Sequence, residues 1–210
     1  GGAIAGFGGG AVLAAVAKDS IKAASDLSES VSKAKVVFGE SSKEVLKFAE
    51  NSATAFGQSR QQAIEAAGTF GNLFVSMKIG VKESAGMSTS LVKLASDLAS
   101  FNNTDPTEAL DALRSGLLGE SEPLQRFGIN LNEATLKTEA MALGLKIVSG
   151  TLNPAQKAQA AYSVILKQST TAQGDFARTA GGLANQQRIA NAQFEDAKTV
   201  LGEKLLPIAL

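Results

Sequence analysis

The side chains that most often carry out enzymatic chemistry are largely missing from this sequence. It contains no histidine and no cysteine. Ser-His-Asp triads, His-ligated zinc sites and cysteine nucleophiles are therefore excluded. Carboxylates are the remaining choice for acid–base catalysis.

Two carboxylate pairs are the candidates for such chemistry. Glu120 and Glu122 lie in a turn close in sequence to Arg126, and Glu195 and Asp196 are adjacent in a helical pattern. Acidic residues at the start of a short helix are favoured by the helix dipole, and Glu195 and Asp196 flank an apolar stripe as a solvated face does. We therefore expect no enzyme activity, no catalytic residue, no metal site and no cofactor.

The glycine-rich opening could suggest a phosphate-binding loop. It has neither the Gly-Lys-Ser/Thr ending of a Walker loop nor the strand that precedes a dinucleotide-binding turn. Gly2, Gly6 and Gly10 instead follow the four-residue spacing of apolar helices that pack closely or lie in a membrane. Residues 1–17 carry no charge, and an irregular lead-in to the first helix is the other interpretation.

The elements that would position any site are helices throughout. Alanine, leucine, lysine, glutamine and glutamate predominate and favour helices, and no useful stretch alternates as a strand does. We predict an all-α fold of seven or eight helices of about 12–25 residues, joined as hairpins or a bundle. The predicted helices cover residues 12–38, 42–56, 59–77, 87–101, 106–118, a short piece after Pro123, 136–147, 154–165 and 190–205.

Start signals support several of these boundaries. Ser41 with Glu44, Ser59 with Gln62 and Asn153 with Gln156 are potential capping boxes. Asp105-Pro106 places a capping carboxylate before a proline at the first helical position. Gly68 and Gly71 lie inside a predicted helix, where each is costly, and therefore indicate close approach of another backbone.

The clearest periodicity belongs to the 87–101 stripe, which we define as Met87, Leu91, Leu94, Leu98 and Phe101. Its 4-3-4-3 spacing is that of a coiled coil or a tight bundle. The stripe is too short to identify a coiled coil. An interface within the chain and an interface between copies both remain open.

Charge gives little reason to expect nucleic acid as a partner. Lys and Arg total 20 and Asp and Glu total 20, so the formal net charge is zero. Binding to phosphate backbones depends on clustered positive charge, and the arginines are scattered singly along the chain. We expect no specific nucleic-acid binding.

Three stretches together resemble tail tape measure proteins of long-tailed, siphovirus-type bacteriophages. They run from Val37 to Phe74, from Asp105 (DPTEALDALRSGLLGESEPLQRFGINLNEATL) to Leu136, and from Gly150 through TAGGLANQQRIANAQFEDAKTVLGEKLLP. The resemblance covers about residues 20–207 in the same order. Charge and helix pattern divide the chain into an apolar lead-in, 1–17, and a helical tape-measure-like segment, 18–207, with possible sub-boundaries near 102–105 and 170–182. We expect both ends to be cut from a longer protein.

The resemblance implies a structural role in the virion. Such a protein fills the lumen of the tail tube, sets its length during assembly and leaves ahead of the DNA. Its implied partners are tail tube and distal tail proteins, other copies of itself and, at infection, the host membrane. Its implied locations are the lumen of the virion tail tube and, during infection, the host cell envelope. A membrane-active helical protein that forms a channel is the alternative, and an enzyme that uses Glu120 or Glu122 is third.

Overall fold

The computed structural model describes residues 7–147 and 150–209, and the all-α prediction is confirmed for them. Seven of the described helices have ten residues or more. Across all the described α-helices the lengths range from four to 32 residues, which is wider than predicted. In chain order the elements are α1 (Phe7–Phe38), η1 (Gly39–Ser41), α2 (Ser42–Ala49), α3 (Ser52–Phe56), α4 (Arg60–Ser76), α5 (Val81–Phe101), α6 (Pro106–Leu118), α7 (Glu122–Gln125), α8 (Glu133–Ala142), α9 (Pro154–Gln168), α10 (Asp175–Arg178) and α11 (Leu183–Ala209).

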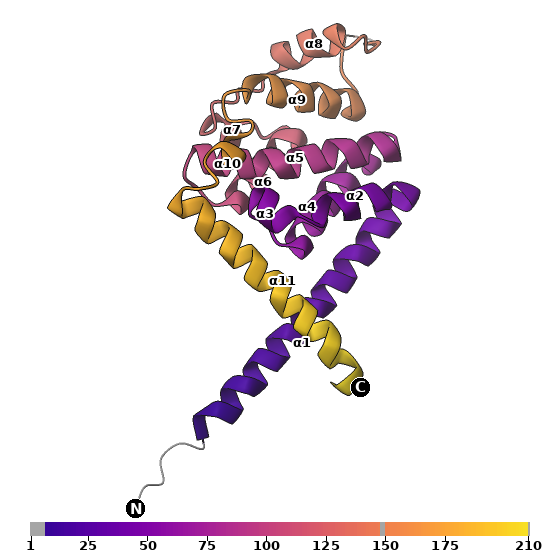
Figure 1. Ribbon diagram of the computed structural model, residues 1–210. Helices are drawn as coiled ribbons and strands as arrows, with labels where there is room; N and C mark the ends of the chain where they lie inside the picture. The colour runs from indigo at the N-terminus through magenta and orange to yellow at the C-terminus, as the bar shows by residue number, and fades with distance from the viewer. Residues whose placement is uncertain (1–6, 148–149, 210) are drawn as a thin grey trace, which may run out of the picture.

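The helices form a packed body from which two long helices extend (Figure 1). In the body α4 packs on α5, α5 on α6, α6 on α9 and α9 on α8, and α8 is the outermost helix. The indigo helix α1 and the yellow helix α11 leave the body at opposite sides and cross below it. The described ends of the chain therefore lie on the same side of the body.

A continuous apolar core joins most of the helices. Its largest fully buried side chains come from α1, α4, α5, α6 and α9 and from short connecting segments. They are Phe38, Phe74, Phe176, Ile64, Leu91, Leu98, Leu113, Leu124, Ile129 and Ile165. A smaller cluster, around Ala140, Leu152 and Ala160, holds α8 against α9. The outermost helix thus packs mainly on α9, and its Leu136 also reaches the main core.

Three of the predicted helix starts are confirmed. Ser59 with Gln62 and Asn153 with Gln156 each form both hydrogen bonds of a capping box. The carboxylate of Asp105 accepts a hydrogen bond from the Thr107 backbone N–H at 2.7 Å. These local signals work because each satisfies backbone donors that the first helical turn leaves unpaired.

The capping box predicted at Ser41 is wrong. Ser41 has helical backbone angles, φ −72° and ψ −9°, and its side chain makes no capping hydrogen bond. An extended backbone at the capping position is what aims the side chain at the first turn. Here the chain passes from α1 through the 3-10 turn into α2 without an extended residue.

Two other predicted helices have different bounds. The helix predicted for 42–56 is broken at Asn51, where the Ser52 hydroxyl donates to the Ala49 carbonyl at 2.9 Å. The break lets Val45 and Phe56 both reach the core. The helix predicted for 136–147 ends at Ala142, because Gly144 has a positive φ of 72° and the chain turns there.

The predicted apolar face of the last helix is also wrong. The apolar stripe that Glu195 and Asp196 flank in the sequence consists of Ala190, Phe194, Ala197, Leu201 and Leu205, and such a stripe predicts a buried face. In the structure Phe194 is 64% exposed and Leu201 is 41% exposed. The buried positions on α11 are instead Asn185, Ala192, Thr199 and Gly202. Small residues let α11 approach α1 closely, and hydrophobic periodicity does not identify such a face.

The prediction that Gly68 and Gly71 of α4 lie against another backbone is wrong, because both lie against side chains. A Cβ atom at Gly71 would lie 2.1 Å from Cζ of Phe38, and one at Gly68 would lie 3.6 Å from the stem of Lys33. Gly71 therefore makes room for the ring that ends α1. Across residues 7–147 and 150–209, no helix is long and apolar enough to cross a membrane.

Candidate functional site

Four members of the 87–101 stripe lie in the core of the chain. Met87, Leu91, Leu94 and Leu98 are all buried on α5, which packs between α4 and α6. Phe101, at the end of α5, is 51% exposed. The stripe therefore forms an interface within the chain over most of its length, and Phe101 lies outside that interface.

Two of the three lead-in glycines with four-residue spacing lie outside the described residues. Gly2 and Gly6 lie outside the described residues, and Gly10 lies within α1. Further along α1, Val12 and Leu13 are 62% and 71% exposed, and Val16 is also exposed. The lead-in is thus helical from Phe7 onward and presents apolar side chains to its surroundings.

The two carboxylate pairs considered in the sequence, for which we expect no catalytic role, do not form a shared site. Glu120 and Glu122 are exposed, and Arg126 pairs with Glu108 instead of with either of them. Hydrogen bonds from Thr104 and from Arg126 lower the pKa of the Glu108 carboxyl. This cluster ties the start of α6 to the turn after α7, which is a structural role.

Asp196 has a role that the sequence pattern did not indicate. Its Oδ1 accepts a hydrogen bond at 2.8 Å from the backbone N–H of Arg60, the first residue of α4. Such a first-turn donor has no partner within its own helix. Burial raises the pKa of the Asp196 carboxyl, while this hydrogen bond acts against the rise. Asp196 therefore joins α11 to α4 and does not belong to a solvated face as predicted.

A polar network fastens the start of α11 to the end of α5. The buried Asp97 accepts hydrogen bonds from the backbone N–H groups of Gly174 (2.9 Å) and Phe176 (3.2 Å). Ser100 donates to Asp175 at 2.7 Å and accepts from Asn185 at 2.9 Å. These contacts fix the connection that contains α10, within the predicted sub-boundary at 170–182.

Arg188 extends this network to the other predicted sub-boundary, 102–105. Its guanidinium donates to the Thr104 carbonyl at 2.7 Å and to the Asn185 side chain at 2.5 Å. Arg188 and Asn185 both belong to the TAGGLANQQR stretch. The resemblance of that stretch to tape measure proteins drew attention to these two residues, but it did not indicate what they contact.

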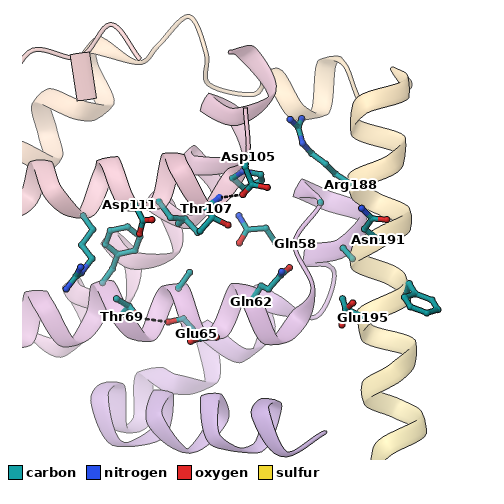
Figure 2. Close-up of a pocket in the computed structure, with 18 residues that line it drawn as sticks. Gln58, Gln62, Glu65, Thr69, Asp105, Thr107, Asp111, Arg188, Asn191 and Glu195 are labelled. Atoms are coloured by element: carbon teal, nitrogen blue, oxygen red, sulfur yellow. Dashed lines mark hydrogen bonds between the residues drawn. The ribbon is translucent and has the colours of Figure 1, made fainter. Parts of the chain in front are cut away.

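A cleft of about 630 Å³ lies between α4, α6 and α11. In Figure 2, α6 carries Thr107 and Asp111 along one side, α4 carries Gln62 and Glu65 along the other, and α11 closes one end with Asn191 and Glu195. Apolar surface in the cleft comes from Ala66, Phe70, Pro106, Leu110, Ala192 and Phe194. The cleft therefore combines an apolar wall with polar groups, as small-ligand sites do.

Gln58 lines this cleft, and within the described residues the nitrogen of its side-chain amide is hydrogen-bonded whereas the oxygen is not. It is 3% exposed, and its Nε2 donates to the Val92 carbonyl (3.3 Å) and the Ser96 hydroxyl (2.7 Å) of α5. Its buried Oε1 has no hydrogen-bond partner in the described part of the chain. Figure 2 shows Gln58 reaching between Thr107 of α6 and Gln62 of α4. Sequence reasoning missed Gln58, because a lone glutamine between two helices has no distinctive pattern.

No metal site accompanies the cleft, because the described residues contain no group of three or more acidic side chains placed to hold an ion. Comparison of the chain with protein-family models, with curated proteins and with solved structures gives no match. Function must therefore be argued from the sequence motifs and from the contacts described above.

Proposed function

We propose that this chain is a folded segment of a tail tape measure protein of a long-tailed bacteriophage. The observation that supports this proposal is that the three stretches with the family's pattern are joined to one another by specific hydrogen bonds. If the three stretches shared only a helix-rich composition with the family, specific hydrogen bonds between them would not be expected.

The first and third stretches meet where Asp196 accepts from the backbone of Arg60. The second and third meet at a reciprocal pair of hydrogen bonds: Asn130 donates its backbone N–H to Gln168 Oε1 at 2.7 Å, and Gln168 Nε2 donates to the Asn130 carbonyl at 3.3 Å. Arg188, in the third stretch, binds the Thr104 carbonyl directly before the second. The motif residues thus specify one packed unit, which agrees with a structural role.

A packed unit does not measure length in the way that a continuous helix does. One helix of 210 residues would span on the order of 315 Å at 1.5 Å per residue. We propose that the segment is extended inside the tail tube and adopts the compact fold after release. The capping residues and the alanine- and glycine-rich helix faces stabilise that released form.

Tail length measured by electron microscopy tests the ruler function. In a phage that carries an in-frame deletion of three heptads, residues 84–104, an extended segment shortens the tail by about 32 Å. Unchanged tail length would contradict a measuring role for this segment. A control deletion of the same length, placed outside the tape measure gene, checks that tail assembly itself is unaffected.

The extended state can be tested separately with a pair of introduced thiols. Ser100 Oγ and Thr179 Oγ1 lie 3.0 Å apart in the compact fold, and the chain has no cysteine of its own. With S100C and T179C together, mild oxidation should form a disulfide in the released protein but not in intact tails. A disulfide in intact tails would contradict the extended state, and S100C alone is the matched control.

Membrane activity during infection is the second candidate function, and the exposed apolar arm of α1 favours it. Val12, Leu13 and Val16 are exposed, and the described part of the chain has no charge before Lys18. An uncharged apolar helix surface is suited to inserting into a lipid interface. Dye release from liposomes should therefore require residues 1–17; equal release by the protein lacking them would contradict this role.

A further inference from the structure

We propose that the cleft between α4, α6 and α11 binds an alkylammonium group, that is, a protonated amine on an aliphatic chain. The ligand is either a free linear polyamine or a lysine side chain presented by another polypeptide. This proposal is independent of the tape measure function, since it rests only on the groups that face the cleft.

The buried Oε1 of Gln58 is the first reason. A buried carbonyl oxygen without a partner is costly, so its presence calls for a hydrogen-bond donor that the described part of the chain does not supply. The amide cannot simply be reversed, because its Nε2 already donates to two acceptors on α5, the Val92 carbonyl and the Ser96 hydroxyl. The missing partner must therefore be a donor.

The charges around the cleft select a cationic donor. Four carboxylates line it, those of Glu65, Asp105, Asp111 and Glu195, against two cationic groups, those of Arg114 and Arg188. Arg188 directs its donors at the Thr104 carbonyl and Asn185. The surplus of acceptors suits an ammonium group, which has three donors and no acceptor.

The carboxylates also retain free capacity. Asp105 uses Oδ1 to cap α6, and Glu65 uses Oε2 to accept from Gln61 at 2.6 Å. An ionised carboxylate accepts more than one hydrogen bond, so each of these two side chains can take a further donor. The Asp111 carboxylate forms no ion pair within residues 7–147 and 150–209, and it faces the cleft (Figure 2).

The apolar wall of the cleft accounts for the aliphatic part of the ligand. Ala66 and Phe70 on α4 face Pro106 and Leu110 on α6 across the same space. The methylene chain of a polyamine or lysine packs on apolar surface while its charged end stays among polar groups. A small inorganic cation would leave this wall uncovered, which is why we propose an alkylammonium group.

Titration of the purified protein with spermidine, followed by amide chemical shifts, tests the proposal. At low salt the shifts should centre on Gln58, Thr107 and Asn191, and added sodium chloride should weaken binding by screening the charges. A parallel titration uses a short lysine peptide and its acetylated form. Binding of spermidine identifies a free polyamine site; binding of the lysine peptide alone, lost on acetylation, identifies a polypeptide partner.

Charge-neutral variants of similar shape connect the binding to this cleft. The double variant E65Q/D111N should weaken binding at least tenfold, while E120Q/E122Q, which removes two exposed carboxylates outside the cleft, should change it less than twofold. Q58M should also weaken binding, and circular dichroism checks that it folds. Absence of binding by either ligand at millimolar concentration, or equal binding by E65Q/D111N and the unaltered protein, would overturn the proposal.

Discussion

Gly202 of α11 rests directly on the backbone of Ser20 of α1, at the point where the two long helices cross. A Cβ atom at Gly202 would lie 1.8 Å from the Ser20 carbonyl oxygen and 2.9 Å from the Cβ of Ala24. No real side chain tolerates such distances. The crossing below the body in Figure 1 therefore depends on the absence of a side chain at this one position.

Gly202→Ala should separate α11 from α1. The backbone of Ser20 cannot move aside as a flexible side chain can, so we expect destabilisation at or above the roughly 1–3 kcal/mol typical of overpacked sites. Urea unfolding followed by circular dichroism measures the change in the free energy of unfolding. Gly86→Ala is the matched control, because nothing lies within 4 Å of a Cβ there. Alanine in the exposed interior of α5 should stabilise the protein by up to about 1 kcal/mol.

Asp97→Ala should loosen the connection that carries α10. Its carboxylate is the partner of the Gly174 and Phe176 N–H groups, and a buried N–H left without a partner costs about 1–3 kcal/mol. Hydrogen exchange should accelerate at Gly174 and Phe176 before it does in α5. Glu120→Ala, in an exposed turn, is the control. Unchanged exchange at both amides would show that Asp97 does not hold this segment.

The attachment of α8 should weaken in acid. Glu139 on α8 accepts hydrogen bonds from Lys167 (2.7 Å) and Ser163 (2.6 Å) on α9, and these lower the pKa of its carboxyl from the ordinary 4.5. Because the folded-state pKa lies below the unfolded one, the stabilisation is present above pH 4.5 and is lost as pH falls through the folded value. Hydrogen exchange of α8 measured against pH should show this loss, and Glu139→Gln should remove it.

Asp196 should show the opposite dependence on pH. Burial raises its pKa above the ordinary 3.8, so its contribution to stability is present below pH 3.8 and is lost as pH rises through the folded value. Asp196→Asn keeps an oxygen for the Arg60 N–H and removes the buried charge. It should therefore leave stability at pH 7 unchanged or slightly higher and flatten this pH dependence, as measured by urea unfolding. Asp196→Ala, which removes the acceptor, should lower stability at every pH.

Local signals in the sequence predicted local structure well. The caps at Ser59, Asp105 and Asn153 could be recognised because all the interacting atoms lie within three residues of one another. Ala24, Leu27 and Phe38 in the predicted helix 12–38 also follow the spacing of one helix face, and all three are buried. These predictions depend on periodicity and on short-range hydrogen bonds alone.

The long-range contacts could not be predicted in the same way. The cleft brings Asp111 of α6 and Asn191 of α11 together with Gln58 of the connection between α3 and α4, and their sequence spacing carries no sign of this proximity. Likewise, the hydrogen bond between Arg60 and Asp196 joins residues 136 positions apart. Such pairings depend on how the helices pack, which composition and periodicity leave undetermined.

The two faces of α11 provide a direct test of periodicity against packing. Periodicity places Phe194 and Leu201 in a core, where substitution costs several kcal/mol, whereas their exposure in the fold predicts that F194Q and L201Q each cost at most about 0.5 kcal/mol. Gly202→Ala on the buried face should instead cost at least about 1–3 kcal/mol, because a Cβ atom there would lie 1.8 Å from the Ser20 carbonyl oxygen. Urea unfolding of the three variants at several protein concentrations checks both expectations. A large, concentration-dependent loss for F194Q and L201Q would show that another copy covers this face in solution, because only a contact between molecules responds to concentration.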